Sequence, residues 1–219
     1  MWIKICANTN LADAQLAASL GADALGFVFA PSARRVTADH VAAILPHLPS
    51  SIEKIAVVQS HNAQELIDLV RHTGLTGLQL HGGLDLPLIR TLHHEFAGRV
   101  TLIQTLHWAV GEDASSASQL TAQLREIAAE PGLTRVLIDA KVGSATGGTG
   151  RTFDWQAAQA SLSSTGNIDL IVAGGLHPDN VAEAIEALTP WGVDVASGVE
   201  SSPGHKDPDK LRRFIQNAR

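Results

Sequence analysis

The sequence predicts an α/β protein, a single-domain (β/α)8 barrel with a parallel eight-stranded sheet over residues 1–219. Three observations predict it. Short, continuous apolar runs recur along the chain, as expected of parallel strands that are buried on both faces. An amphipathic stretch rich in Ala and Leu follows each run. Eight such units, each of about 25–30 residues, fill the chain, which matches the usual size of βαβ units and of such barrels.

The expected strands, in order, are 2–6, 23–29, 53–58, 76–80, 99–105, 135–139, 168–173 and 192–196. The expected helices are 10–20, 37–46, 63–72, 85–96, 115–129, 154–161, 179–188 and 208–217. Gly21 is a plausible stop for the first helix. Thr37 can cap the second, and Asn62 with Glu65 resembles a capping box for the third. Pro208 suits the first turn of the last helix, where a missing N–H costs little.

An open doubly wound sheet is the competing architecture. It usually has fewer strands and a Gly-rich turn after its first strand. Here that turn is Cys6-Ala7-Asn8-Thr9, which contains no glycine. No linker or low-complexity tract divides the chain, and the Gly/Ser/Thr-rich segment 140–153 falls between a strand and a helix. The sequence therefore favours the closed (TIM-type) barrel.

Composition excludes several classes of protein. The 219 residues include one cysteine, and the formal charge is −6. A lone cysteine forms neither an internal disulfide nor a structural zinc site. The acidic balance argues against nucleic-acid partners and anionic membranes, and no apolar run approaches the length of a membrane span. The N-terminal MWIKIC reads as a strand and not as a signal peptide, so we expect a cytoplasmic protein.

A thiol and a carboxylic acid fall at the ends of expected strands. Cys6 ends the first strand and Asp139 ends the sixth. Barrel enzymes carry their active sites at this C-terminal face. A carboxylate after an apolar strand is poorly solvated, which can raise its pKa and suit it to general acid catalysis, although it can also simply order a loop. A lone cysteine is most often a small buried apolar residue, but opposite Asp139 it becomes a candidate nucleophile or base.

Glycine-rich loops follow the last three expected strands. Their candidate ligand-binding residues are Gly148, Gly150, Gly174, Gly175, Ser197 and Gly198. Glycine lets several backbone N–H groups approach a ligand, and barrels commonly bind phosphate after strands seven and eight. The GSATGGTG stretch lacks the lysine of a nucleotide P-loop. We therefore expect a phosphate site here, with tight turns as the simpler alternative.

Three further residues are candidate substrate contacts. Arg34 lies in the loop after strand two and could grip a carboxylate, or could be a solvated loop residue. Gln79 and His81 end strand four, where a turn or packing role for His81 is equally plausible. The ten histidines show no HExxH or other clear ligand spacing, so the sequence predicts neither a metal site nor a cofactor.

Six ordered motifs carry a resemblance to phosphoribosylanthranilate isomerases, enzymes of tryptophan biosynthesis. They are Lys4-Ile5-Cys6, GADALGFVFAPSARRV (21–36), GLQLHG (77–82), LIDAKVGSATGGTGRTFDW (137–155), IVAGGLHPDNV (171–181) and DVASGVESSPGHKD (194–207). The resemblance covers residues 4–207, and the full ordered set is specific. It implies a cofactor-free Amadori rearrangement of N-(5-phosphoribosyl)anthranilate to 1-(2-carboxyphenylamino)-1-deoxyribulose 5-phosphate. The implied partner is this small phosphosugar; monomer and homodimer both stay open.

The resemblance also implies roles for individual residues. Cys6 would be the general base that removes the C2′ proton, and Asp139 the general acid that protonates the ring oxygen. Arg34 would hold the anthranilate carboxylate, and the glycine loops would hold the phosphate. One departure is Ala7, where the family usually has glycine.

Two rival functions remain. A related barrel enzyme of histidine biosynthesis would carry Asp at the end of strand one, where this chain has Cys6. A non-catalytic phosphosugar-binding paralogue would keep the glycine loops but lose turnover.

Overall fold

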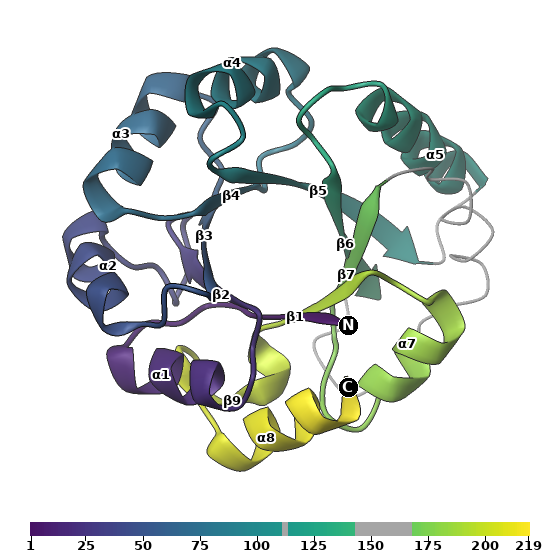
Figure 1. Ribbon diagram of the computed structural model, residues 1–219. Helices are drawn as coiled ribbons and strands as arrows, with labels where there is room; N and C mark the ends of the chain where they lie inside the picture. Colours follow the sequence, from purple (N-terminus) through teal and green to yellow (C-terminus); the bar gives the residue numbers. More distant parts are fainter. Residues whose placement is uncertain (111–113, 143–167) are drawn as a thin grey trace.

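The protein is described by a computed structural model that covers residues 1–110, 114–142 and 168–219. Eight strands close into a barrel in chain order, and helices surround it (Figure 1). All neighbouring strands run parallel, and β1 closes the ring by pairing with β8, with Trp2 opposite Gly192. The (β/α)8 prediction is confirmed, and the open sheet is excluded.

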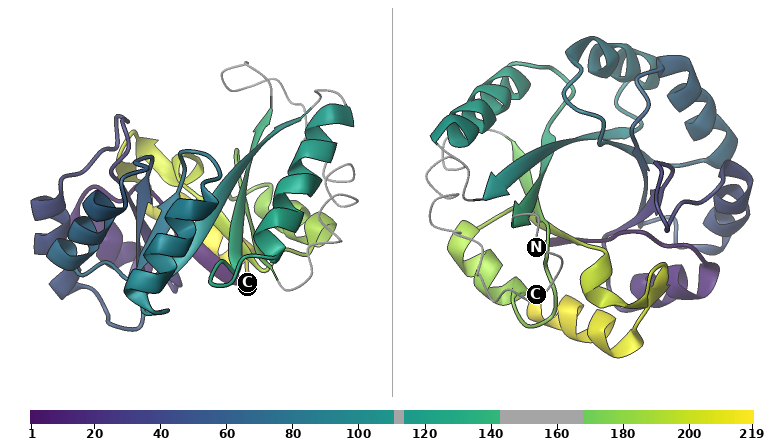
Figure 2. Two further views of the ribbon diagram at one scale, coloured as in Figure 1. Left: turned by 90° about the horizontal axis from the view of Figure 1, so that it is seen from above. Right: turned by 180° about the vertical axis from the view of Figure 1, so that it is seen from behind.

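The barrel strands are β1 (Trp2–Ile5), β2 (Ala24–Val28), β3 (Glu53–Val58), β4 (Gly77–Leu80), β5 (Thr101–Val110), β6 (Arg135–Val142), β7 (Asp169–Ala173) and β8 (Gly192–Val195). Most lie within two residues of their expected bounds, but β5 was expected to end at 105 and continues to Val110. It is longer because it pairs with β6 from Ile103–Arg135 to Val110–Val142, so the two strands support each other beyond their neighbours. The side view shows them as long arrows (Figure 2).

The helices are α1 (Leu11–Ser19), α2 (Ala38–Ile44), α3 (Ala63–Thr73), α4 (Leu86–Phe96), α5 (Ala114–Ala128), α7 (Val181–Leu188) and α8 (Pro208–Asn217). Thr37 and Asn62 cap α2 and α3 as predicted, whereas Glu65 turns to Ser60 and does not complete the capping box. The helix expected at 154–161 lies outside the described residues. Among the described helices, none has the length and apolar character to cross a membrane.

Four short elements were not predicted. A 3-10 turn, η1 (Leu45–His47), follows α2. After β8 come a second, η2 (Ser197–Val199), and a small antiparallel hairpin of β9 (Glu200–Ser202) and β10 (His205–Lys206). The hairpin carries two buried charged residues, Glu200 and Lys206, to the top of the barrel. It therefore builds part of the site described below.

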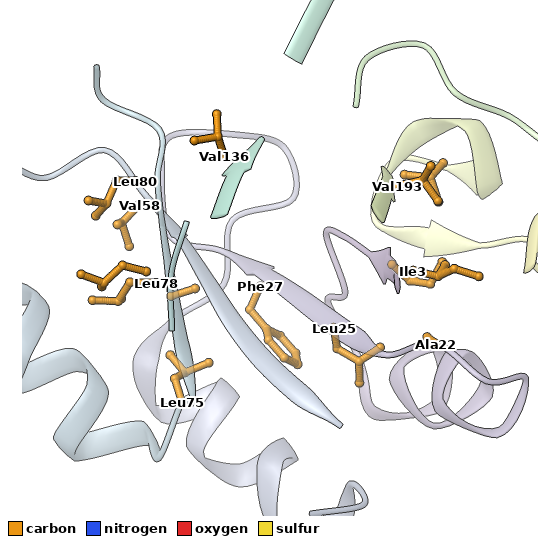
Figure 3. Close-up of a cluster of buried hydrophobic side chains, with 14 of the residues drawn as sticks. Ile3, Ala22, Leu25, Phe27, Val58, Leu75, Leu78, Leu80, Val136 and Val193 are labelled. Atoms are coloured by element: carbon orange, nitrogen blue, oxygen red, sulfur yellow. The ribbon is translucent and has the colours of Figure 1, made fainter. Parts of the chain in front are cut away.

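Two apolar cores follow from the alternation of side chains along the strands. The larger fills the space between barrel and helices; Figure 3 shows Leu25, Phe27 and Leu78 in it. The smaller fills the barrel itself and contains Trp2, Ala24, Ile55, Ile103, Leu137, Ile171 and Ala173. Packing inside the barrel leaves only its ends for a ligand.

Aromatic rings close the N-terminal end of the barrel. The ring centroids of Trp2 and Trp191 lie 5.1 Å apart. The guanidinium carbon of Arg135 lies 4.6 Å from the centroid of Trp191 and 5.4 Å from that of Trp2. Arg135 also donates to Glu53 Oε2 at 2.6 Å. This end is therefore stacked and charge-paired, and the open cavity lies at the other end.

Candidate active site

A cavity of about 410 Å³ opens at the C-terminal ends of the strands. Every described residue of the predicted site lines it: Cys6, Arg34, Gln79, His81, Asp139, Gly174, Gly175, Ser197 and Gly198. Gly148 and Gly150 lie outside the described residues. The barrel therefore brings together residues that are up to 192 positions apart, from Cys6 to Gly198.

Cys6 follows β1 and is almost fully buried, with 7% of its surface exposed. Its backbone N–H donates to Val195 O at 2.8 Å, and its carbonyl accepts from Lys206 Nζ at 2.6 Å. Gly26 on the next strand makes room for the sulfur, since a Cβ at that position would lie 2.7 Å from Sγ. The thiol is therefore held in one place beside the cavity.

A buried ion pair lies next to this thiol. Lys4, fully buried two residues before Cys6, donates to Asp194 Oδ1 at 2.8 Å. Burial raises the pKa of Cys6 above its ordinary value, although the charge of Lys4 pulls the pKa down. Burial alone would lower the pKa of Lys4, but Asp194 and Cys6 outweigh it and the net pKa is raised. Lys4 therefore stays charged and favours the thiolate form of Cys6.

The turn after Cys6 is strained. Ala7 has φ = +61°, in the left-handed region that costs a residue with a Cβ about 1–2 kcal/mol. The buried Asn8 holds the turn: its backbone N–H donates to Gly26 O at 2.9 Å, and its side-chain amide donates to Ile5 O at 2.8 Å. The φ of this position explains why the resembling family usually has glycine there, and it shows that alanine is accommodated.

Arg34 faces the cavity, but a carboxylate already occupies most of its guanidinium. Nε lies 2.9 Å from Glu200 Oε1, and Nη2 lies 2.6 Å from Glu200 Oε2. Lys206 Nζ lies 3.4 Å from the same carboxylate. Burial would raise the pKa of Glu200, but Arg34 and Lys206 outweigh it and lower the pKa. A chain of charges thus links Arg34 through Glu200 and Lys206 to the carbonyl of Cys6.

Asp139 lies on β6 directly opposite His107 of β5. Its side chain is 24% exposed, and its Oδ2 lies 3.7 Å from Nδ1 of His107. The ring of His81, at the end of β4, meets the ring of His107 edge to face, with centroids 4.7 Å apart. The carboxyl group is thus in contact with the cavity and with a cluster of imidazoles, unlike the buried thiol.

The loops after β7 and β8 pack closely on each other. A Cβ at Gly198 would lie 1.9 Å from the carbonyl oxygen of Leu176, so only glycine fits. Gly174 and Gly175 have φ of +94° and +66°, which glycine adopts without strain. Asn180 donates from its amide to Gly175 O at 3.1 Å and fixes that loop. The result is a glycine-lined wall of the cavity, as a phosphate site requires.

Sequence reasoning missed four charged or polar residues of this region: His107, Asp194, Glu200 and Lys206. His107 was missed because the fifth strand was predicted to end at residue 105, whereas it continues to Val110. Ile103 and Thr105 face the inside of the barrel, so the alternation of side chains along a longer strand would have placed His107 on the same side. Asp194, Glu200 and Lys206 fall inside the motif quoted above, but nothing in their spacing shows that they pair with Lys4, Arg34 and the Cys6 carbonyl.

Comparison with known proteins gives the family. The sequence matches the model of the N-(5′-phosphoribosyl)anthranilate (PRA) isomerase family over residues 3–217. It is 37% identical to the N-(5′-phosphoribosyl)anthranilate isomerase of Chlorobaculum tepidum, covering 99% of this chain and 94% of that protein. It is 38% identical to the isomerase of Desulforudis audaxviator, covering 99% and 97%.

Solved structures agree. The phosphoribosyl anthranilate isomerase of Thermotoga maritima superposes with a TM-score of 0.84 at 31% identity, covering 100% of this chain and 98% of that one. Another such isomerase was solved in complex with reduced 1-(o-carboxyphenylamino)-1-deoxyribulose 5-phosphate; its TM-score is 0.80 at 29% identity, with 100% and 98% coverage. The chain belongs to the N-(5′-phosphoribosyl)anthranilate isomerase family.

Proposed function

We propose that this enzyme isomerises N-(5′-phosphoribosyl)anthranilate to 1-(2-carboxyphenylamino)-1-deoxyribulose 5-phosphate, with Cys6 as general base and Asp139 as general acid. The observation that carries the proposal is that both groups line one cavity in different surroundings. β7 and β8 separate their strands on one side of the barrel, and β2–β5 on the other. A substrate between them can meet an acid and a base on different sides.

The chemistry needs one acid and one base. Asp139 donates its proton to the ring oxygen of the sugar while the C1′–O bond breaks and an iminium forms. The neighbouring C2′–H becomes acidic, and the thiolate of Cys6 takes that proton to give an enolamine, which tautomerises to the ketone. Nothing is oxidised or reduced overall, because the aldose carbon is reduced as its neighbour is oxidised within one molecule.

The two groups lie in different surroundings: the thiol is buried, which raises its pKa, whereas the carboxyl group is partly exposed. Lys4 favours the thiolate of Cys6 electrostatically. Asp139 lies nearer solvent, with its Oδ2 3.7 Å from Nδ1 of His107. The glycine loops after β7 and β8 would take the phosphate through backbone N–H groups, together with Gly148 and Gly150.

Two side chains have capacity left for the rest of the substrate. Glu200 occupies Nε and Nη2 of Arg34, which leaves Nη1 for the anthranilate carboxylate. Gln79 donates to Thr105 Oγ1 at 3.1 Å, while its buried Oε1 accepts from no residue in the described part of the chain. A sugar hydroxyl on this oxygen would satisfy it. His81 completes this side of the proposed site.

The substrate's fluorescence tests the proposal directly. We expect the wild type to remove the anthranilate-type fluorescence of the substrate, and Cys6→Ala and Asp139→Asn to lower kcat about 10²–10⁴-fold, as loss of a general base or acid does. Asp139→Asn keeps the shape of the side chain. A wild type that binds but never turns over would support the phosphosugar-binding paralogue. Near-full activity of Cys6→Ala would disprove its role as base.

We also propose a cytoplasmic location. The free thiol of Cys6 would serve as base only where it stays reduced, and the cytosol keeps thiols reduced. The partner under this proposal is the phosphosugar substrate, with no nucleic acid and no membrane.

A further inference from the structure

We propose that the mouth of the barrel also holds a transition-metal site formed by His81, His107 and Asp139, and that a bound Zn²⁺ would switch the enzyme off. One ligand atom from each residue can be chosen so that all three lie within 4.8 Å of one another. The binding claim stands on this geometry alone. The inhibition claim rests on the proposed role of Asp139 as general acid.

The strand register explains why the three groups meet. His107 and Asp139 are directly paired residues on β5 and β6, so their side chains leave the sheet on the same face. His81 follows β4, the neighbour of β5 on its other side. The three residues are 26 and 32 positions apart in the sequence, which no local ligand motif would show. Adjacent parallel strands ending at one face bring them together.

The distances are close to those of a metal site. Nδ1 of His107 and Oδ2 of Asp139 are 3.7 Å apart. Ligand atoms about 2.0–2.1 Å from a tetrahedral zinc are separated by about 3.3 Å. The imidazole centroids of His81 and His107 are 4.7 Å apart, and two imidazoles on one such ion have centroids about 5 Å apart. Small side-chain rotations would therefore complete the site.

The ligand types indicate which ions would bind. Two imidazoles and one carboxylate suit Zn²⁺, Co²⁺ or Ni²⁺, whereas Mg²⁺ and Ca²⁺ prefer oxygen ligands. His81 and Asp139 line the cavity, so a fourth position would face the substrate space and take water. Three protein ligands with one open position is the usual arrangement of an exchangeable zinc.

Metal binding and the proposed catalysis would exclude each other. A carboxylate coordinated to Zn²⁺ is ionised, so it carries no proton for the ring oxygen. The ion and its water would also stand in the cavity wall that the substrate must contact. Zinc should therefore compete with substrate, and the site would be an inhibitory one that adds no chemistry to the reaction.

The test begins with binding, which needs no turnover. We expect Co²⁺ to give the absorption bands of a four-coordinate ion at one equivalent, and Zn²⁺ to displace it. His107→Asn and His81→Asn should each weaken binding by more than about tenfold, since even supporting residues of metal sites cost 10–100-fold. The matched control is His177→Asn, because His177 lies 3.9 Å from Asp179 without a third ligand in the described chain. Its affinity should equal that of the wild type.

Two further readouts keep the proposal falsifiable if a variant folds poorly. In the wild type, Zn²⁺ should shift the ring NMR signals of only two of the ten histidines. Zinc inhibition should be competitive with substrate and should weaken in His107→Asn. Unchanged affinity in both His81→Asn and His107→Asn, or equal loss in His177→Asn, would overturn the site. Binding without inhibition would leave the site but overturn the exclusion.

Discussion

At the scale of single residues, Ala7 carries backbone strain beside the proposed base. Its φ of +61° suits glycine. Replacing it by glycine removes the strain but increases the conformational entropy of the unfolded chain, which offsets part of the gain. Ala7→Gly should therefore raise the free energy of unfolding by about 1 kcal/mol or slightly less. Urea unfolding measures this change.

Ala97 provides the control for that prediction. It has φ = +48° at the end of α4 and does not line the cavity. Ala97→Gly should give a similar gain in stability with unchanged kinetics. A loss of stability in Ala7→Gly alongside a gain in Ala97→Gly would show that the Cβ of Ala7 makes contacts worth more than its strain.

Glu200 acts through Arg34, so it is a positioning residue. Glu200→Gln removes the charge that holds the guanidinium and should raise KM about tenfold, equal to about 1.4 kcal/mol of binding, with a smaller change in kcat. The Arg90–Glu130 pair has the same two-bond geometry away from the cavity, with Nε–Oε1 of 2.9 Å and Nη2–Oε2 of 2.8 Å. Glu130→Gln should lower stability only. Equal KM values in the two variants would contradict the role of Glu200.

The pH profile follows from the environment of Cys6. Burial raises its pKa, so the thiol is mostly protonated at neutral pH, while a base must be deprotonated. Only the thiolate reacts with an alkylating agent, so we expect the alkylation rate of Cys6 to rise about tenfold per pH unit through neutrality until the thiol ionises. Lys4 lowers that pKa, so Lys4→Met should move the rising limb to higher pH. Lys54→Met replaces another buried lysine and is the control, which should leave the pH dependence unchanged. An unchanged pH dependence in Lys4→Met would contradict the electrostatic effect of Lys4 on Cys6.

At the scale of elements, the packing of the loop after β8 against the loop after β7 requires glycine at position 198. Gly198→Ala would put a Cβ 1.9 Å from Leu176 O, so the two phosphate-side loops must separate. We expect affinity for inorganic phosphate, measured by calorimetry, to fall at least about tenfold, together with lower stability.

Gly98→Ala is the control for this change. Gly98 has φ = +75° with no atom near its absent Cβ, so alanine there costs backbone strain alone. It should lower stability and leave phosphate affinity unchanged. Equal phosphate affinity in Gly198→Ala and the wild type would remove this loop from the proposed phosphate site.

At the scale of the whole molecule, the sequence was sufficient for the barrel because each β/α unit is local: an apolar run, a cap such as Asn62, then an amphipathic helix. It also placed Cys6, Arg34 and Asp139 on one face, since strand ends of a barrel share a face. What it did not predict were side-chain pairings between units that lie far apart in the sequence. The bonds of Glu200 to Arg34 and of Lys4 to Asp194 join residues 166 and 190 positions apart.

The indole pair of Trp2 and Trp191, at the N-terminal end of the barrel, provides an optical signal for closure of the barrel during folding. Trp2 lies on the first strand and Trp191 immediately before the last, so their rings meet only when β1 has docked on β8. Two indoles 5.1 Å apart couple their transitions and should produce a paired band in circular dichroism. Helix formation gives no such band. A refolding experiment that follows this paired band would therefore measure the rate of barrel closure separately from the formation of the α-helices. The Trp2→Phe variant, which lacks the indole pair, is the control.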